Sequence, residues 1–130
     1  MTLAKSPMNA IRNASNNTFQ GNQKKVLTVC SAGLMRSPSL AYVLQKELGY
    51  NTRSCGAALD FCLVPISEAL VAWAEEIVFV DQFAYDYMSQ EDREFILDWG
   101  VEVTVLDIPD EYPWMDEDLQ KICLEQYLNH

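Results

Sequence analysis

The amino-acid sequence predicts a three-layer α/β domain in which a four-stranded parallel sheet is covered by helices on both faces. Short apolar runs rich in β-branched residues alternate along the chain with stretches whose apolar residues recur at helical spacing. The clearest of these runs are apolar throughout, as is typical of strands buried on both faces of a parallel sheet. At 130 residues, the chain has room for one domain with a single core.

The predicted strands follow one another with a helix after each. We expect them at residues 26–29, 51–55, 77–80 and 101–106. Residues 26–29 and 77–80 are continuous apolar runs of the kind that buried strands have, whereas residues 51–55 are weak when taken alone. The order βαβαβαβα with right-handed crossovers predicts a doubly wound, flavodoxin-like fold.

The predicted helices are bounded by capping residues. We expect helices at residues 38–48, 66–75, 82–88, 90–99 and 117–127. Ser37, Ser89 and Asp116 are suitable N-caps, and Gly49 is placed to end the first helix. Pro38 fits the first helical position after Ser37. The helices should also anchor the core through tryptophans, and we expect this of Trp73 and Trp99.

Two parts of different character divide the chain. Residues 1–23 are rich in Asn and Ser and lack periodicity, so we expect a flexible N-terminal leader, with the domain at residues 24–130. The leader lacks the apolar block of a secretory signal, and no apolar run approaches the ~20 residues that span a bilayer. The default expectation is therefore a cytoplasmic protein.

Charge and composition exclude several classes of partner. The chain carries 19 acidic against 9 basic residues, a net charge of −10, which disfavours nucleic acid and anionic membranes as partners. The four cysteines lack paired C-x-x-C spacing, and His130 is the only histidine. We therefore expect no metal, no cofactor and no disulfide framework. Acid–base chemistry would have to use carboxylates or cysteine.

Residues 30–37, with the sequence Cys-Ser-Ala-Gly-Leu-Met-Arg-Ser, carry the clearest chemical signal. They link a predicted strand to a helix N-terminus, where backbone N–H groups and the helix dipole favour an anion. Cys30 should be a thiolate there, and the planar guanidinium of Arg36 can grip two phosphate oxygens. Ser37 is close enough to donate a hydrogen bond to the thiolate. The remaining phosphate-binding residues would be Ser31, Ala32, Gly33, Leu34 and Met35.

This loop and two further segments resemble the low-molecular-weight protein tyrosine phosphatases, in particular short bacterial and phage-like members. The loop has the C-x5-R-S pattern of that family, with a glycine inside and Ser-Pro leading into a helix. Arg53-Ser54-Cys55-Gly56 looks like the second strand and its turn. Residues 106–112, followed by Met115-Asp116, look like the late acid loop. The resemblance covers roughly residues 24–128.

The resemblance implies the phosphotyrosine phosphatase I fold and hydrolysis of phosphate monoesters through a phosphocysteine. Cys30 would attack phosphorus, Arg36 would hold the phosphoryl oxygens, and Ser37 would assist departure of the thiolate. The substrate would be a phosphotyrosine protein or a small aryl phosphate, with phosphate or vanadate as inhibitors. An aspartate of the late loop would protonate the leaving group.

The identity of that acid rests on the late loop. Asp110 is favoured over Asp107 by its spacing to the final helix, and Asp107 remains the alternative. Tyr112 and Trp114 would form the rim of the pocket and stack on a phenyl ring.

Three other functions remain open. The start of the loop also looks like that of the sugar phosphotransferase IIB phosphocysteine carriers, which have no arginine at the position of Arg36. A thioredoxin-coupled arsenate reductase would need two further cysteines near residues 81–100, and the sequence has none there. A phosphotyrosine-binding module of low turnover is the third alternative. Gly33 stands where many members of the phosphatase family have Asn, which bears on the rigidity of the loop.

Overall fold

A four-stranded parallel sheet forms the centre of the computed structural model, which describes residues 23–31, 36–58, 64–113 and 115–130. The strands are β1 (Lys25–Cys30), β2 (Asn51–Gly56), β3 (Glu76–Phe79) and β4 (Glu102–Val105). Their order in the sheet is β2-β1-β3-β4, and every pairing is parallel. This order is that of a doubly wound sheet and confirms the predicted fold class. The expectations for residues 1–22 and for Cys62 lie outside the described residues.

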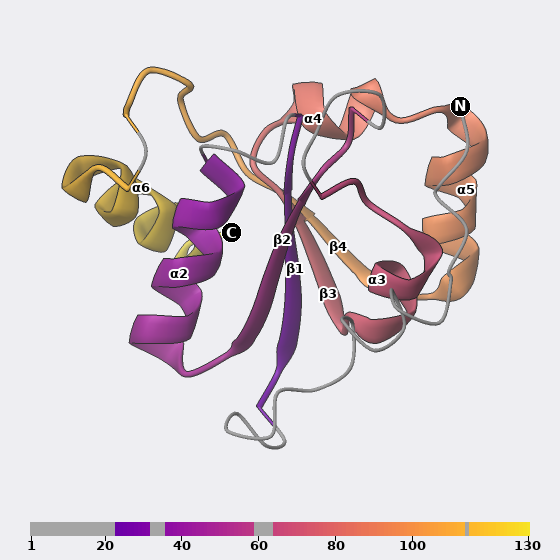
Figure 1. Cartoon of the computed structure of the whole chain (residues 1–130), viewed down its shortest axis with the longest axis horizontal. Coiled ribbons are helices and arrows are strands. Elements are labelled where there is room, and N and C mark those ends of the chain that lie inside the picture. The colour runs from indigo at the N-terminus through magenta and orange to yellow at the C-terminus, as the bar shows by residue number, and fades with distance from the viewer. Residues whose placement is uncertain (1–22, 32–35, 59–63, 114) are drawn as a thin grey trace.

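Helices cover both faces of the sheet, which is seen nearly edge-on in Figure 1. The helices α2 (Arg36–Leu48) and α6 (Glu117–Leu128) lie on one side. On the other side lie α3 (Glu68–Trp73) and α5 (Gln90–Trp99). The short α4 (Gln82–Tyr87) lies at the end of the sheet where the strands finish. No helix in the described ranges is long and apolar enough to cross a membrane.

Side-chain caps fix most of the helix boundaries. The Ser89 hydroxyl accepts from the N–H of Asp92, and the Asp116 carboxylate accepts from the N–H of Leu119, as predicted for these two caps. Gly49 follows α2 with φ of 71°, a backbone angle that glycine adopts without strain. Local sequence therefore determines where these helices begin and end.

Two predicted helices differ from the structure by two residues at an end, and two others differ by one residue. The first begins at Arg36, so Ser37 lies inside α2 and is not its N-cap. The second begins at Glu68, because Ser67 caps it with a hydrogen bond from the Leu70 N–H, and it ends at Trp73. In the first case the Ser37 hydroxyl makes a tertiary contact, described below, in place of the local capping bond.

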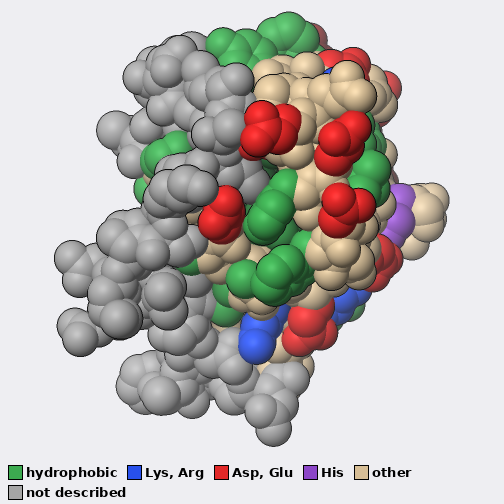
Figure 2. Space-filling view, turned by 90° about the vertical axis from the view of Figure 1, so that its right-hand side faces the viewer, with side chains coloured by type: hydrophobic (Ala, Val, Ile, Leu, Met, Phe, Trp, Pro, Cys, Tyr) green, Lys and Arg blue, Asp and Glu red, His purple; other side chains and the backbone are tan. Residues whose placement is uncertain are grey.

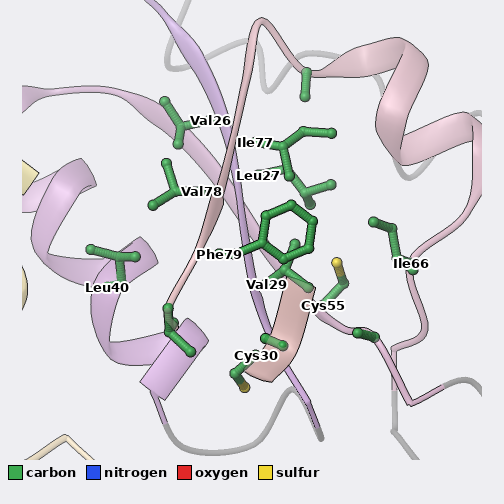
Figure 3. Close-up of a cluster of buried hydrophobic side chains, with 14 of the residues drawn as sticks. Val26, Leu27, Val29, Cys30, Leu40, Cys55, Ile66, Ile77, Val78 and Phe79 are labelled. Carbon is green, nitrogen blue, oxygen red and sulfur yellow. The ribbon is translucent and has the colours of Figure 1, made fainter. Parts of the chain in front are cut away.

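The core has two layers, one on each face of the sheet. Figure 3 shows Leu27 and Phe79 on the side of Ile66, and Val26 on the side of Leu40. All five side chains are fully buried. This alternation follows from the period of two along a strand. Since Cys30 is an even number of residues from Val26, its side chain lies on the α2 face.

The prediction that Trp99 anchors the core is wrong, whereas Trp73 is buried as expected. Trp99 is 54% exposed and stacks on Phe95 with ring centroids 6.0 Å apart. The inward side of α5 is occupied by Ile96, three residues earlier. The side chain of Trp99 is therefore directed to solvent at the last turn of the helix.

A fully buried carboxylate, Glu76, lies at the start of β3, at the opposite end of this strand from the candidate site. The Lys24 ammonium lies 2.9 Å from it, and the hydroxyls of Thr104 and Tyr127 donate to it at 2.6 and 2.7 Å. Burial alone would raise the pKa of Glu76, but these three donors outweigh it and hold the pKa below its ordinary value. Burial and the bond to Glu76 raise the pKa of Tyr127.

Replacing Glu76 by glutamine should therefore destabilise the fold by about 1–3 kcal/mol at pH 7, because the half-buried Lys24 ammonium and two hydroxyls lose a charged acceptor. A carboxylate whose pKa is lowered on folding stabilises fully above its unfolded pKa of about 4.3, and this contribution is lost as pH falls through the folded pKa. Urea unfolding between pH 3 and 7 measures both effects.

The matched control for that experiment is Glu102→Gln. Glu102 is 3.9 Å from the same ammonium but 58% exposed, so its loss should change stability by less than about 0.5 kcal/mol. Equal losses in the two variants would contradict a structural role for the Glu76 network.

Candidate active site

The candidate nucleophile lies at the carboxyl end of β1, beside the first turn of α2. Cys30 is buried, and its thiol donates to the Ser37 hydroxyl oxygen at 3.1 Å. The Ser37 hydroxyl in turn donates to the Cys55 carbonyl at 3.3 Å, and the Ser37 carbonyl accepts from the Thr28 hydroxyl at 2.7 Å. A hydroxyl held in this way can rotate to donate to the sulfur when Cys30 is a thiolate.

The guanidinium of Arg36 is directed inward from the first residue of α2, and the residue is only 5% exposed. Its Nη1 lies 2.6 Å from Asp81 Oδ2 and donates to the Ile108 carbonyl oxygen at 2.9 Å. These partners follow β3 and β4, and they are 45 and 72 residues away in sequence. Their bonds fix the plane of the guanidinium, which is what bidentate recognition of an oxyanion requires.

The two candidate acids lie in different surroundings. Asp110 Oδ1 is 3.6 Å from Nε of Arg36, while the side chain stays 71% exposed. Asp107 is exposed, and its backbone N–H and carbonyl are both bonded to the side-chain amide of Gln126, at 2.7 and 2.6 Å. The structure therefore brings Asp110 to the arginine, whereas the two bonds of Asp107 hold the segment after β4 against α6.

The first two residues of the loop are held by the residues that directly follow β2. The carbonyl oxygens of Cys30 and Ser31 accept from the N–H groups of Ala57 and Ala58 at 2.9 and 2.8 Å. The four residues that follow, Ala32 to Met35, lie outside the described part of the chain, and so does Trp114. The other rim candidate, Tyr112, is half-buried and packs against the hydrophobic core.

Asp81 is a site residue that the sequence reasoning missed. One of its carboxylate oxygens contacts Arg36, and the other caps α4 by accepting from the Ala84 N–H at 2.8 Å. A signal for it exists in the sequence, because an acidic residue directly follows the buried run 77–80. Carboxyl ends of adjacent parallel strands share one edge of the sheet, so such a residue is placed beside Cys30.

The other two described cysteines lack the surroundings of a nucleophile. Cys55 is fully buried on β2, and Cys123 is fully buried on α6. Burial raises the pKa of Cys123 to about 12, although the charge of Arg36 acts in the opposite direction. Cys123 therefore stays a thiol at neutral pH, as expected for a core cysteine.

Comparison with solved structures identifies the fold. Wzb from Vibrio vulnificus, solved with benzylphosphonate, superposes with a TM-score of 0.58 at 19% identity, covering 81% of this chain and 92% of that protein. The tyrosine phosphatase Wzb from Escherichia coli K30, solved with phosphate, gives 0.57 at 15% identity, with 82% and 95% covered. The chain has the low-molecular-weight protein tyrosine phosphatase fold.

The same phosphatase fold includes a protein described by a different substrate. The YwlE arginine phosphatase from Geobacillus stearothermophilus superposes with a TM-score of 0.59 at 16% identity, with 82% of this chain and 97% of that one covered. Searches with protein-family models and among curated proteins gave no match. The low-molecular-weight phosphatase fold is thus established by structure, at identities too low to transfer a substrate.

Proposed function

We propose that this protein is a cysteine-dependent phosphatase that hydrolyses phosphate monoesters, and protein phosphotyrosine in particular. The observation that supports this most directly is the pairing of Cys30 with Ser37 next to a buried, oriented Arg36. In the phosphatase fold these groups lie at the carboxyl end of the central strand, where doubly wound sheets bind ligands. Among the described residues, the hydrogen bonds of Arg36 to Asp81 and to the Ile108 carbonyl both start from Nη1, and a guanidinium has further N–H groups that can bind an oxyanion.

The mechanism has two chemical steps. The Cys30 thiolate attacks phosphorus and forms the S–P bond as the P–O bond of the ester breaks, and Asp110 gives its proton to the leaving oxygen. Water then attacks the phosphocysteine, Asp110 takes a proton from that water, and the thiolate leaves as Ser37 donates to it. Arg36 holds the equatorial phosphoryl oxygens in both steps, where charge stabilisation is usually a large contribution.

Steady-state hydrolysis of p-nitrophenyl phosphate by the full chain tests the proposal. Inorganic phosphate should be released without any protein partner, and vanadate should inhibit competitively. A phosphocysteine carrier would release none and would accept phosphate from a histidine-phosphorylated protein. That pair of results would overturn the proposal. Phosphotyrosine and phosphoarginine peptides should be compared as well, because one structural neighbour is described as an arginine phosphatase.

The choice between the two candidate acids gives a further prediction. Asp110→Asn should slow hydrolysis of substrates with poor leaving groups by about 10²–10⁴-fold, and should affect strongly acidic phenols little, because these depart without a proton. Log kcat/KM plotted against leaving-group pKa should therefore become steeper. Asp107→Asn is the matched control, and its slope should equal that of the wild type. A steeper slope in the Asp107 variant alone would reverse the assignment. Unchanged slopes in both would move the role to another residue of the loop, with Glu111 next.

A further inference from the structure

The outer side of α4 presents two aromatic side chains to solvent. Phe83 is 61% exposed and Tyr87 is 43% exposed. They are four residues apart on the helix, and their ring centroids lie 5.8 Å from each other. Figure 2 shows hydrophobic side chains at the upper end of the molecule, the end at which Figure 1 places α4. We call this surface the Phe83–Tyr87 pair.

The pair is tied to the candidate active site through the first residue before the helix. Asp81 contacts Arg36 at 2.6 Å with one carboxylate oxygen and caps α4 with the other. Since consecutive Cα atoms are 3.8 Å apart, the Cα of Phe83 lies within about 7.6 Å of that of Asp81. The helix that carries the pair is therefore capped by the residue that contacts the arginine proposed to hold a phosphoryl group.

The opposite side of α4 prevents the pair from turning inward. Ala84 is fully buried, and Tyr85 packs edge-to-face on the core residue Phe79, with centroids 5.1 Å apart. The two aromatic side chains are exposed to water. They therefore lack the stabilisation that burial would give, which is about 25 cal/mol for each Å² of apolar surface. Buried aromatic residues are also the side chains that contribute most at protein interfaces.

Charged side chains on α4 and at the candidate site indicate which kind of partner would bind. Asp86 lies between the two aromatic residues in sequence and is 57% exposed, with Arg93 3.6 Å from it. Beyond the arginine of the site, Asp110 is 71% exposed and Glu111 is exposed as well. Asp110 lies beside Arg36, so the acidic residues Asp110 and Glu111 belong to the mouth of the candidate site. Acidic side chains at that mouth favour a segment with basic residues and disfavour an acidic one.

We infer that the Phe83–Tyr87 pair is a docking surface for the polypeptide that carries the phosphorylated residue. Its occupant is an apolar side chain next to the phosphoresidue, in a segment that also carries basic residues. The inference rests on the proposed phosphatase function, and it adds the class of protein substrate to it.

The test uses the full chain with the double substitution Phe83→Ala/Tyr87→Ala. Three substrates are compared: a phosphotyrosine peptide with Leu beside the phosphoresidue and Lys further out, the same peptide with Gly in place of Leu, and p-nitrophenyl phosphate. The double variant should lose about tenfold more kcat/KM on the Leu peptide than on p-nitrophenyl phosphate, as is typical when interface anchors are truncated. Leu97→Ala on α5, which removes a side chain of similar exposure (58%), is the matched control.

Equal losses on all three substrates, or a loss in the Leu97 variant as large as in the double variant, would overturn the docking surface. Binding of the Leu peptide to the Cys30→Ser protein, measured by fluorescence anisotropy, separates the docking proposal from the phosphatase proposal. If neither the wild type nor any variant releases phosphate, the phosphatase proposal fails. Weaker binding of the Leu peptide after the double substitution would still support docking. If phosphate is released but binding and selectivity do not change, docking fails and the phosphatase proposal stands.

Discussion

Cys30→Ser should abolish phosphate release, with a loss on the order of 10⁴–10⁶-fold, the scale seen when an enzyme loses its nucleophile. Serine keeps nearly the size of cysteine and the contact to Ser37, but its hydroxyl does not ionise near pH 7. The pocket should therefore still bind vanadate or phosphate with measurable affinity. Initial rates on p-nitrophenyl phosphate, together with calorimetric titration of phosphate, measure both parts of the prediction.

Cys123→Ser is the matched control for that experiment. It also replaces a cysteine sulfur by oxygen, but at a buried thiol that does not ionise at neutral pH. Burial raises the pKa of this thiol to about 12. It should cost stability but keep turnover per folded molecule. A Cys30→Ser protein with turnover near the wild-type rate would remove Cys30 as the nucleophile, and equal losses in the two variants would indicate damage to the core.

Arg36→Lys should be nearly as damaging as Arg36→Ala, with a loss on the order of 10²–10³-fold in kcat. An ammonium keeps the charge but cannot offer the planar, bidentate fork that three equatorial oxygens need. The contacts to Asp81 and to the Ile108 carbonyl, which orient the guanidinium, would also be lost or rearranged. A lysine variant that keeps most of the activity would mean that Arg36 acts only as a diffuse charge.

Asp81→Asn tests whether Asp81 orients the Arg36 guanidinium for catalysis or only pairs with its charge. Asparagine still accepts from the Ala84 N–H and can accept one bond from Arg36, so α4 should keep its cap. A positioning role predicts a loss in kcat smaller than that of Arg36→Lys, with a matching loss in vanadate affinity. Unchanged vanadate affinity and kcat would show that the ion pair only stabilises the fold, which thermal unfolding would then report.

Features that depend on residues close together in the chain could be predicted from the sequence. Apolar runs located β1 and β3, and Ser89, Asp116 and Gly49 located helix ends, because capping bonds join residues within four positions of each other. The strand–loop–helix spacing of Cys30 and Arg36 likewise needs no long-range information. These local signals were sufficient for the fold class and for one side of the candidate site.

The distant residues that complete the candidate site could not be predicted in this way, because they depend on how the strands are arranged in the sheet. Asp81 and the Ile108 carbonyl reach Arg36 because β1 lies next to β3, and β3 next to β4, an order that no local pattern specifies. The same holds for Asp110, which contacts the arginine, and for Asp107, which contacts α6. Trp99 was misplaced for the same reason: its exposure depends on how α5 lies against the sheet, which is set by packing between elements far apart in sequence.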